Sequence, residues 1–208
     1  MNPYITYIII GVTALVSYKA FQDASLKWKL IFNAYQIKER KEWYRFFSHG
    51  LIHADWMHFG FNVYVLYSFG KTVELSYVSI FGTVQGYVNY ILLYVGSLLM
   101  SSVYSFVKNL NNPHYNALGA SGAVSAVLFS YIAIYPNSDL GILFIPIPIK
   151  GWVLGGLYLL YSNYMAKKNL DNIGHDAHFW GAVFGFVITF VFEPRLIDNF
   201  ISQITSLI

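Results

Sequence analysis

The chain has 208 residues, of which 56% are hydrophobic and only 11% are charged, and its net charge is +3. Soluble domains carry about 25% charged residues, so the composition excludes an ordinary soluble protein and predicts a polytopic membrane protein. The net charge is too small and too scattered to indicate nucleic-acid binding. There is no cysteine, which excludes disulfides, zinc–thiolate sites and a thiol nucleophile.

Successive apolar stretches of helical length predict an all-α bundle of six transmembrane helices, with residues 1–208 forming a single domain. The first stretch is expected to be a retained span rather than a signal peptide, because Met1-Asn2-Pro3 has no basic region. Prolines at 136, 146 and 148 exclude a continuous helix over residues 139–150. The expected spans are residues 4–21, 56–74, 87–107, 119–135, 151–165 and 176–192.

The segment between the first two spans, residues 23–45, mixes basic with aromatic side chains. Such a mixture is typical of a segment that lies among the lipid headgroups. An ordinary basic loop explains the same composition equally well. Its basic members are Lys27, Lys29, Lys38, Arg40, Lys41 and Arg45, and its aromatic members include Trp28, Phe32, Tyr35, Trp43 and Tyr44.

The fourth span begins with a small-residue turn, Gly119-Ala120-Ser121-Gly122. A serine at the start of a helix lies near unpaired N–H groups and the positive end of the helix dipole, which suits a nucleophile whose attack creates an oxyanion. The alternative is a helix start that Ser121 helps to cap. The span has 17 residues and is about 25 Å long, less than the thickness of a bilayer core. Ser121 is therefore expected below the membrane surface, beside a water-accessible pocket.

The sixth span carries His178, and Gly181 and Gly185 share its helical face. This pair of glycines lets a second helix approach closely. Packing on the fourth span would bring His178 towards Ser121, and a histidine beside a serine is the minimum for nucleophilic catalysis. An inter-helix hydrogen bond is the other interpretation of His178, and Asp176 is expected to be the N-cap of this helix. The small residues offered by the fourth span are Gly122, Ser125 and Ala126.

Two polar residues, His58 and Asn62, share one face of the second span. They could bind a metal, hold a helix contact, or donate hydrogen bonds to a developing negative charge. Metal binding is the weakest interpretation, because asparagine is a poor ligand and the His-Glu-x-x-His motif of zinc proteases is absent. Paired intramembrane aspartates are also absent, which argues against an aspartyl protease. His49 and His53 precede the span, and we expect them to make interfacial hydrogen bonds.

Taken together, these motifs resemble the rhomboid family of intramembrane serine proteases, over nearly the whole chain and in the expected order. The resemblance implies that Ser121 is the nucleophile and His178 the general base. It also implies that His58, Asn62 and the Ser121 N–H hold the oxyanion. The substrates would be transmembrane proteins in the lipid bilayer, and neither a cofactor nor a metal is implied. The motifs are Arg45, the run from His53 to Asn62, Gly70, Glu74, the run from Gly119 to Gly122, and the run from Ala177 to Gly185.

The chain departs from the family pattern at Ser125, where the family often has a tyrosine stacked on the histidine. The family places the N-terminus in the cytosol and the nucleophile near the outer surface, whereas the distribution of basic residues predicts the opposite orientation. A compact chain of six spans suggests a bacterial cytoplasmic membrane.

One alternative function is a rhomboid-like protein that binds transmembrane clients without cutting them. A small transporter or channel is another, but the symmetric broken repeats typical of transporters are absent.

Overall fold

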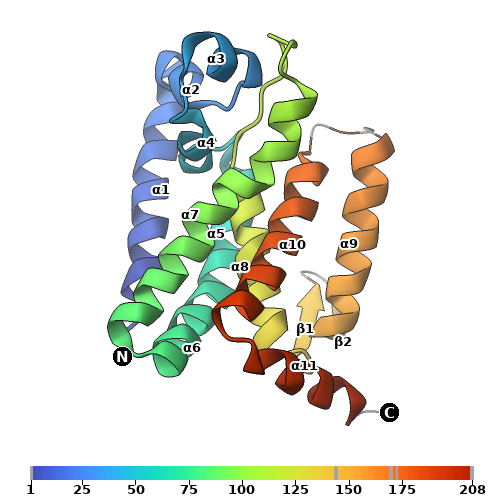
Figure 1. The fold of residues 1–208 in the computed structure, drawn as a ribbon. Coiled ribbons are helices and arrows are strands. Elements are labelled where there is room, and N and C mark those ends of the chain that lie inside the picture. The colour runs from blue at the N-terminus through green and yellow to red at the C-terminus, as the bar shows by residue number, and fades with distance from the viewer. Residues whose placement is uncertain (1, 143–144, 169–170, 172, 207–208) are drawn as a thin grey trace.

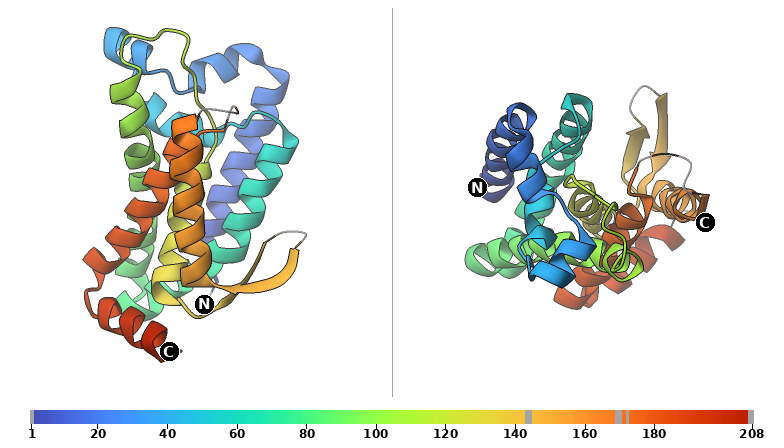
Figure 2. Two further views of the ribbon diagram at one scale, coloured as in Figure 1. Left: turned by 90° about the vertical axis from the view of Figure 1, so that its right-hand side faces the viewer. Right: turned by 90° about the horizontal axis from the view of Figure 1, so that it is seen from above.

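Helix α8 (Ser121–Ile134) lies at the centre of a bundle of helices, and nearly all of its residues are buried (Figures 1 and 2). The computed structural model describes residues 2–142, 145–168, 171 and 173–206. Within them the protein is an all-α membrane bundle of the six-span kind that the sequence predicts. The other helices of the bundle are α1 (Tyr4–Gln22), α5 (Trp56–Val65), α6 (Lys71–Phe81), α7 (Thr83–Lys108), α9 (Gly151–Lys168) and α10 (His175–Phe192).

The central helix is shorter than α7, α9 and α10, which pack on it. Helices α1, α7 and α10 are each long and apolar enough to cross a membrane, whereas α8 has 14 residues and is about 21 Å long. The segment that follows α7 descends from the upper end of the bundle to reach the start of α8 (Figure 1). It is held at the top by Phe32, whose backbone exchanges hydrogen bonds of 2.9 and 3.1 Å with Ala117. The start of α8 therefore lies inside the protein, below the upper ends of α7 and α10.

The second helical segment is longer than expected, because α5 continues through a π-helical turn (Leu66–Gly70) into α6 and ends at Phe81 rather than near Glu74. Glu74, where the span is expected to end, lies inside the helix. Glu74 is buried, and its carboxylate accepts hydrogen bonds of 2.9 and 2.8 Å from the N–H groups of Ile5 and Thr6. A carboxylate from α6 thus supplies acceptors for the unpaired N–H groups of the first turn of α1.

The segment between α1 and α5 folds into a cap over the upper end of the bundle (Figure 1). Trp28 and Trp43 are exposed there, but Arg45 is buried and does not face the headgroups. The Arg45 guanidinium donates to the carbonyl oxygen of Ile31 at 2.6 Å and pairs with Glu42 at 2.6 Å, so it holds the cap together from within. The cap consists of α2 (Ala24–Leu30), α3 (Ala34–Arg40), α4 (Arg45–Ser48) and a 3-10 turn (His49–Leu51).

The connection between α8 and α9 is an antiparallel hairpin of β1 (Asp139–Ile142) and β2 (Ile145–Lys150), in which Asp139 pairs with Lys150. The expectation that this proline-containing segment is not helical is confirmed. A further amphipathic helix, α11 (Arg195–Thr205), follows α10 at the end of the bundle opposite the cap (Figure 1).

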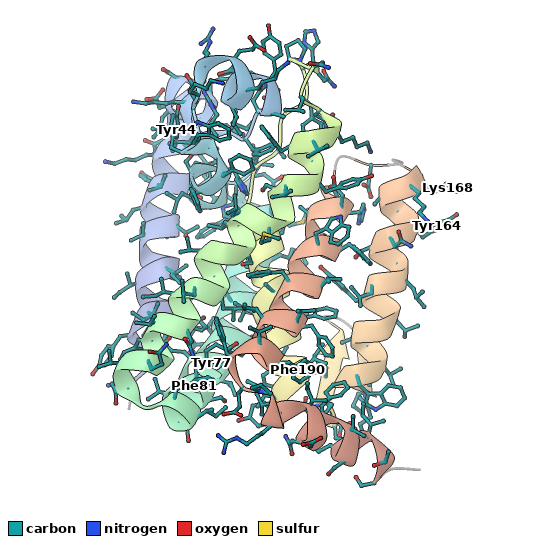
Figure 3. The ribbon with its side chains drawn as sticks, viewed as in Figure 1. Tyr44, Tyr77, Phe81, Tyr164, Lys168 and Phe190 are labelled. Carbon is teal, nitrogen blue, oxygen red and sulfur yellow. The ribbon has the colours of Figure 1, made fainter. Side chains whose placement is uncertain are left out.

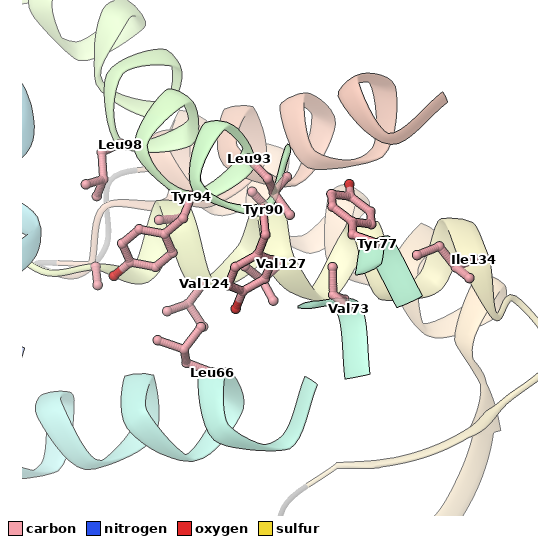
Figure 4. Close-up of a cluster of buried hydrophobic side chains, with 13 residues drawn as sticks. Leu66, Val73, Tyr77, Tyr90, Leu93, Tyr94, Leu98, Val124, Val127 and Ile134 are labelled. Carbon is pink, nitrogen blue, oxygen red and sulfur yellow. The ribbon is translucent and has the colours of Figure 1, made fainter. Parts of the chain in front are cut away.

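The core between α6, α7 and α8 contains tyrosines as well as aliphatic side chains (Figure 4). The Tyr77 hydroxyl lies 3.0 Å from Ser130 Oγ and 2.9 Å from Thr189 Oγ1, so it links α6, α8 and α10. Tyr77 and Phe81 lie near the lower end of the bundle, far from the cap (Figure 3). Buried hydroxyls that bond across helices satisfy one another where no water is available.

Candidate active site

Ser121 is the first residue of α8, and its side chain is half-buried. Ala120 is the N-cap and provides no side-chain cap, and the first intrahelical bond runs from the Val124 N–H to the Ala120 carbonyl oxygen at 2.9 Å. The N–H groups of Ser121, Gly122 and Ala123 therefore have no helical acceptor. Among the described residues, the Ser121 hydroxyl makes no hydrogen bond, so the interpretation of Ser121 as a helix cap is not supported.

Helix α10 packs on α8 through backbone contacts at two glycines. A Cβ atom at Gly181 would overlap the Gly122 carbonyl oxygen, and one at Gly185 would overlap the Ala126 carbonyl oxygen. The two helices are thus closer than any residue with a side chain at these positions would allow. This is the small-residue contact between the fourth and sixth spans that the sequence predicts.

The same contact brings His178 to the start of α8. Gly122 faces the Ala177 carbonyl oxygen as well as Gly181, so it lies beside the turn of α10 that carries His178. Ser121 precedes Gly122 directly. The Ser121 hydroxyl and the His178 ring form no hydrogen bond among the described residues.

His58 and Asn62 approach the same turn from α5. Gly119 has a φ of +112°, and a Cβ atom there would overlap the His58 ring, so the ring lies directly against the backbone that leads into Ser121. The His58 Nδ1 accepts a long hydrogen bond of 3.4 Å from the Ala54 N–H, which assigns the ring proton to Nε2. Asn62 is buried, and its amide donates to the His58 carbonyl oxygen at 2.8 Å. Its second N–H has no described acceptor.

The sequence profile of the Rhomboid domain matches residues 40–195, which make up three-quarters of the chain. The chain belongs to the rhomboid family. The matched range contains the start of α8, the start of α10 and the α5 residues that face them.

This rhomboid protein is similar to a bacterial protease and to mitochondrial rhomboid proteins. Rhomboid protease GlpG from Haemophilus influenzae is 25% identical over 94% of this chain and 93% of its own length. The presenilin-associated rhomboid-like protein of mouse mitochondria is 31% identical over 64% of this chain. Rhomboid protein 1 of yeast mitochondria is 25% identical over a similar share. The matched part spans only 34% of the mouse protein and 37% of the yeast protein.

Two further histidines of the rhomboid fold hold the turn before Ser121. His49 Nδ1 donates to the Gly119 carbonyl oxygen at 3.2 Å, and the Gly119 N–H donates to the His49 carbonyl oxygen at 2.9 Å. His53 Nε2 accepts a long bond of 3.5 Å from the Ala120 N–H, while its Nδ1 lies 2.9 Å from Ser17 Oγ. Both rings are buried. The two rings make hydrogen bonds, as predicted, and their partners at the turn before Ser121 lie inside the protein.

The burial of these two rings also sets their charge. It lowers the pKa of His49 to about 4 and the pKa of His53 to about 3, so both imidazoles are neutral at pH 7. A neutral imidazole donates from one nitrogen and accepts at the other, which is what the two turn contacts require.

Among the described residues, no three His, Asp or Glu side chains lie together as a metal site would need.

Asp176 does not cap α10. The helix begins at His175 after Gly174, and Asp176 lies inside the first turn, where its carboxylate accepts a hydrogen bond of 2.5 Å from Ser105 of α7. The prediction of an N-cap is wrong, because the serine on α7 gives this carboxylate a partner on another helix. Asp176 thereby ties the start of α10 to α7.

At position 125 the chain has no aromatic ring to place on His178, and a ring from α9 lies there instead. Tyr158 stacks on His178 with ring centroids 6.5 Å apart and planes inclined by 27°. Its hydroxyl lies 2.6 Å from Ser125 Oγ. No sequence signal distinguished this tyrosine from the other 17 in the chain.

Proposed function

We propose that this rhomboid protein is an intramembrane serine endopeptidase in which Ser121 is the nucleophile and His178 is the general base. The observation that carries the proposal is the contact of Gly181 with Gly122, because it brings the first turns of α8 and α10 together inside the bundle. The relationship to Rhomboid protease GlpG, over nearly the whole length of both chains, supports the same activity.

In the proposed reaction, His178 takes the proton of the Ser121 hydroxyl as the oxygen attacks the peptide carbonyl carbon. A tetrahedral intermediate forms, and His178 then gives the proton to the leaving amine as the C–N bond breaks. Water attacks the resulting acyl-enzyme by the same route in reverse, which releases Ser121. No cofactor or metal takes part in these steps.

The oxyanion of the tetrahedral intermediate would meet three donors. These are the Ser121 N–H, which has no helical acceptor, the Nε2–H of His58, and the second amide N–H of Asn62. Rigid donors aimed at developing charge stabilise it strongly where water is excluded. The glycines support this arrangement, since Gly119 gives His58 room and Gly122, Gly181 and Gly185 set the spacing of the helices.

We propose transmembrane proteins as substrates and the lipid bilayer as the medium of cleavage. The start of α8 lies inside the bundle below the cap (Figure 1), among helices that are apolar enough to cross a membrane. A bacterial cytoplasmic membrane is the proposed location, because the Haemophilus influenzae relative matches nearly end to end. Binding of transmembrane clients without cleavage is the alternative, and it would also use the polar side chains near the start of α8.

Labelling by a fluorophosphonate tests the proposal. The purified protein in proteoliposomes is incubated with a reporter that has one transmembrane segment, with and without the probe. We expect cleavage that the probe abolishes, and mass spectrometry should locate one label on Ser121. An intact reporter together with an unlabelled Ser121 would contradict the proposal and favour client binding.

The two side-chain donors are tested by His58→Ala and Asn62→Ala. Each variant should lower kcat by about 10²–10³-fold with little change in KM, because each removes a donor that acts on the transition state. The matched control is Asn89→Ala, which removes a buried asparagine of α7 that bonds to Gln85. Its kcat should stay within about twofold of the parent. An unchanged kcat in Asn62→Ala would remove Asn62 from the proposed oxyanion hole.

A further inference from the structure

Tyr158 lies on α9, a helix with few buried residues. Within α9 only Gly151, Gly155 and Ser162 are buried, and the helix lies at the edge of the bundle (Figure 2). Tyr164 and Lys168 lie on α9 near its upper end (Figure 3), and Tyr164 is 57% exposed. Tyr158 points the other way, towards α8 and α10.

Three contacts fix the Tyr158 side chain. Its hydroxyl lies 2.6 Å from Ser125 Oγ, and its ring lies 5.5 Å from the Phe129 ring, both on α8. On α10 it stacks on His178, with centroids 6.5 Å apart. The side chain therefore bridges the helix that begins with Ser121 and the helix that carries His178.

We propose that Tyr158 is a positioning residue that sets the orientation of the His178 ring, with Ser125 as the anchor of its hydroxyl. The inference rests on the proposed role of His178 as the general base. It assigns no contact with the substrate to Tyr158, which acts only through the imidazole.

The need for such a residue follows from the surroundings of His178. Its ring makes no hydrogen bond among the described residues, so hydrogen bonding does not fix its rotation about the Cβ–Cγ bond. An offset aromatic stack restrains that rotation, because the two faces must stay nearly parallel. A general base must be aligned with the proton it takes, and a small misplacement costs a large factor in rate.

The anchor connects this restraint to the nucleophile. Ser125 lies one helical turn after Ser121 on the same face of α8. The hydrogen bond between the Ser125 and Tyr158 hydroxyls therefore fixes the tyrosine relative to α8. The stack on His178 then restrains the imidazole relative to the same helix. The Phe129 ring of the same helix also lies beside the tyrosine ring.

The test compares Tyr158→Phe with Tyr158→Leu by measuring kcat and KM on a transmembrane reporter, together with thermal unfolding in detergent. Phenylalanine keeps the ring and loses the anchor, so we expect kcat to fall by about threefold. Leucine removes the stack, so kcat should fall at least about tenfold with KM within twofold. Tyr164→Leu, a tyrosine on the exposed side of the same helix, should leave kcat unchanged.

The outcomes separate this inference from the proposed function. Equal kcat values for Tyr158→Leu and the parent, or equal losses for the leucine and phenylalanine variants, would overturn the role of the ring. Parent protein that shows no Ser121-dependent cleavage would overturn the proposed function itself. Should the leucine variant unfold, Tyr158→Met, which also lacks a ring, provides the same comparison with Tyr158→Phe.

Discussion

Ser121→Ala is expected to reduce cleavage of a transmembrane reporter by at least about 10³-fold, and His178→Ala by a similar factor. The first variant removes the atom that attacks the substrate. The second leaves a serine hydroxyl that no base deprotonates. The effects should not add, because each residue is ineffective without the other. The double variant should therefore cleave no more slowly than Ser121→Ala.

The measurement is single-turnover cleavage in proteoliposomes, with thermal unfolding recorded for each variant. Ser125→Ala is the matched serine control, since it changes a hydroxyl one turn further along α8 and should lower kcat only severalfold. Cleavage at the parent rate by Ser121→Ala would reveal a contaminating protease. A double variant far slower than either single variant would show that the two residues act independently, which contradicts a Ser–His dyad.

The contact between α8 and α10 was predictable because its cause is local in sequence. Glycines at 181 and 185 recur at helical spacing in an apolar span, and a second span offers small residues at the same spacing. Helices in a membrane pack closely where side chains are small, so the pattern itself indicates the partner surface. The short fourth span likewise indicated that Ser121 lies inside the bundle.

The surroundings of that contact were not predictable, because they depend on loops and on helix order in space. His49 and His53 reach the turn at Gly119 only because the cap folds over it, and nothing in their own neighbourhood of the sequence shows this. Tyr158 reaches His178 from α9, and the sequence does not show which side of α9 packs on α8 and α10. Aromatic residues are so frequent in this chain that one more carries no signal.

Three charged residues have buried partners in the structure that the sequence does not predict. The sequence predicts that Arg45 is one of the basic residues facing the headgroups, that Asp176 caps a helix and that Glu74 ends a span. In the structure each has partners inside the protein. A charge among apolar residues is kept in place by such partners, and the sequence does not show them.

A single methyl group at Gly185 is expected to destabilise the protein by at least about 2 kcal/mol. Alanine normally stabilises a helix relative to glycine by about 0.5–1 kcal/mol. At Gly185, however, the added Cβ atom would overlap the backbone of Ala126 rather than a flexible side chain. The only relief is to move α10 away from α8, which separates His178 from Ser121, so activity should fall together with stability.

Gly156→Ala on α9 is the matched control, because nothing lies within 4 Å of its added Cβ atom. The two substitutions are chemically identical, and the expected changes in the unfolding midpoint have opposite signs. Thermal unfolding in detergent and cleavage of the reporter measure both effects. A Gly185→Ala protein as stable and as active as Gly156→Ala would contradict the close approach of α8 and α10, and with it the arrangement that brings Ser121 and His178 together.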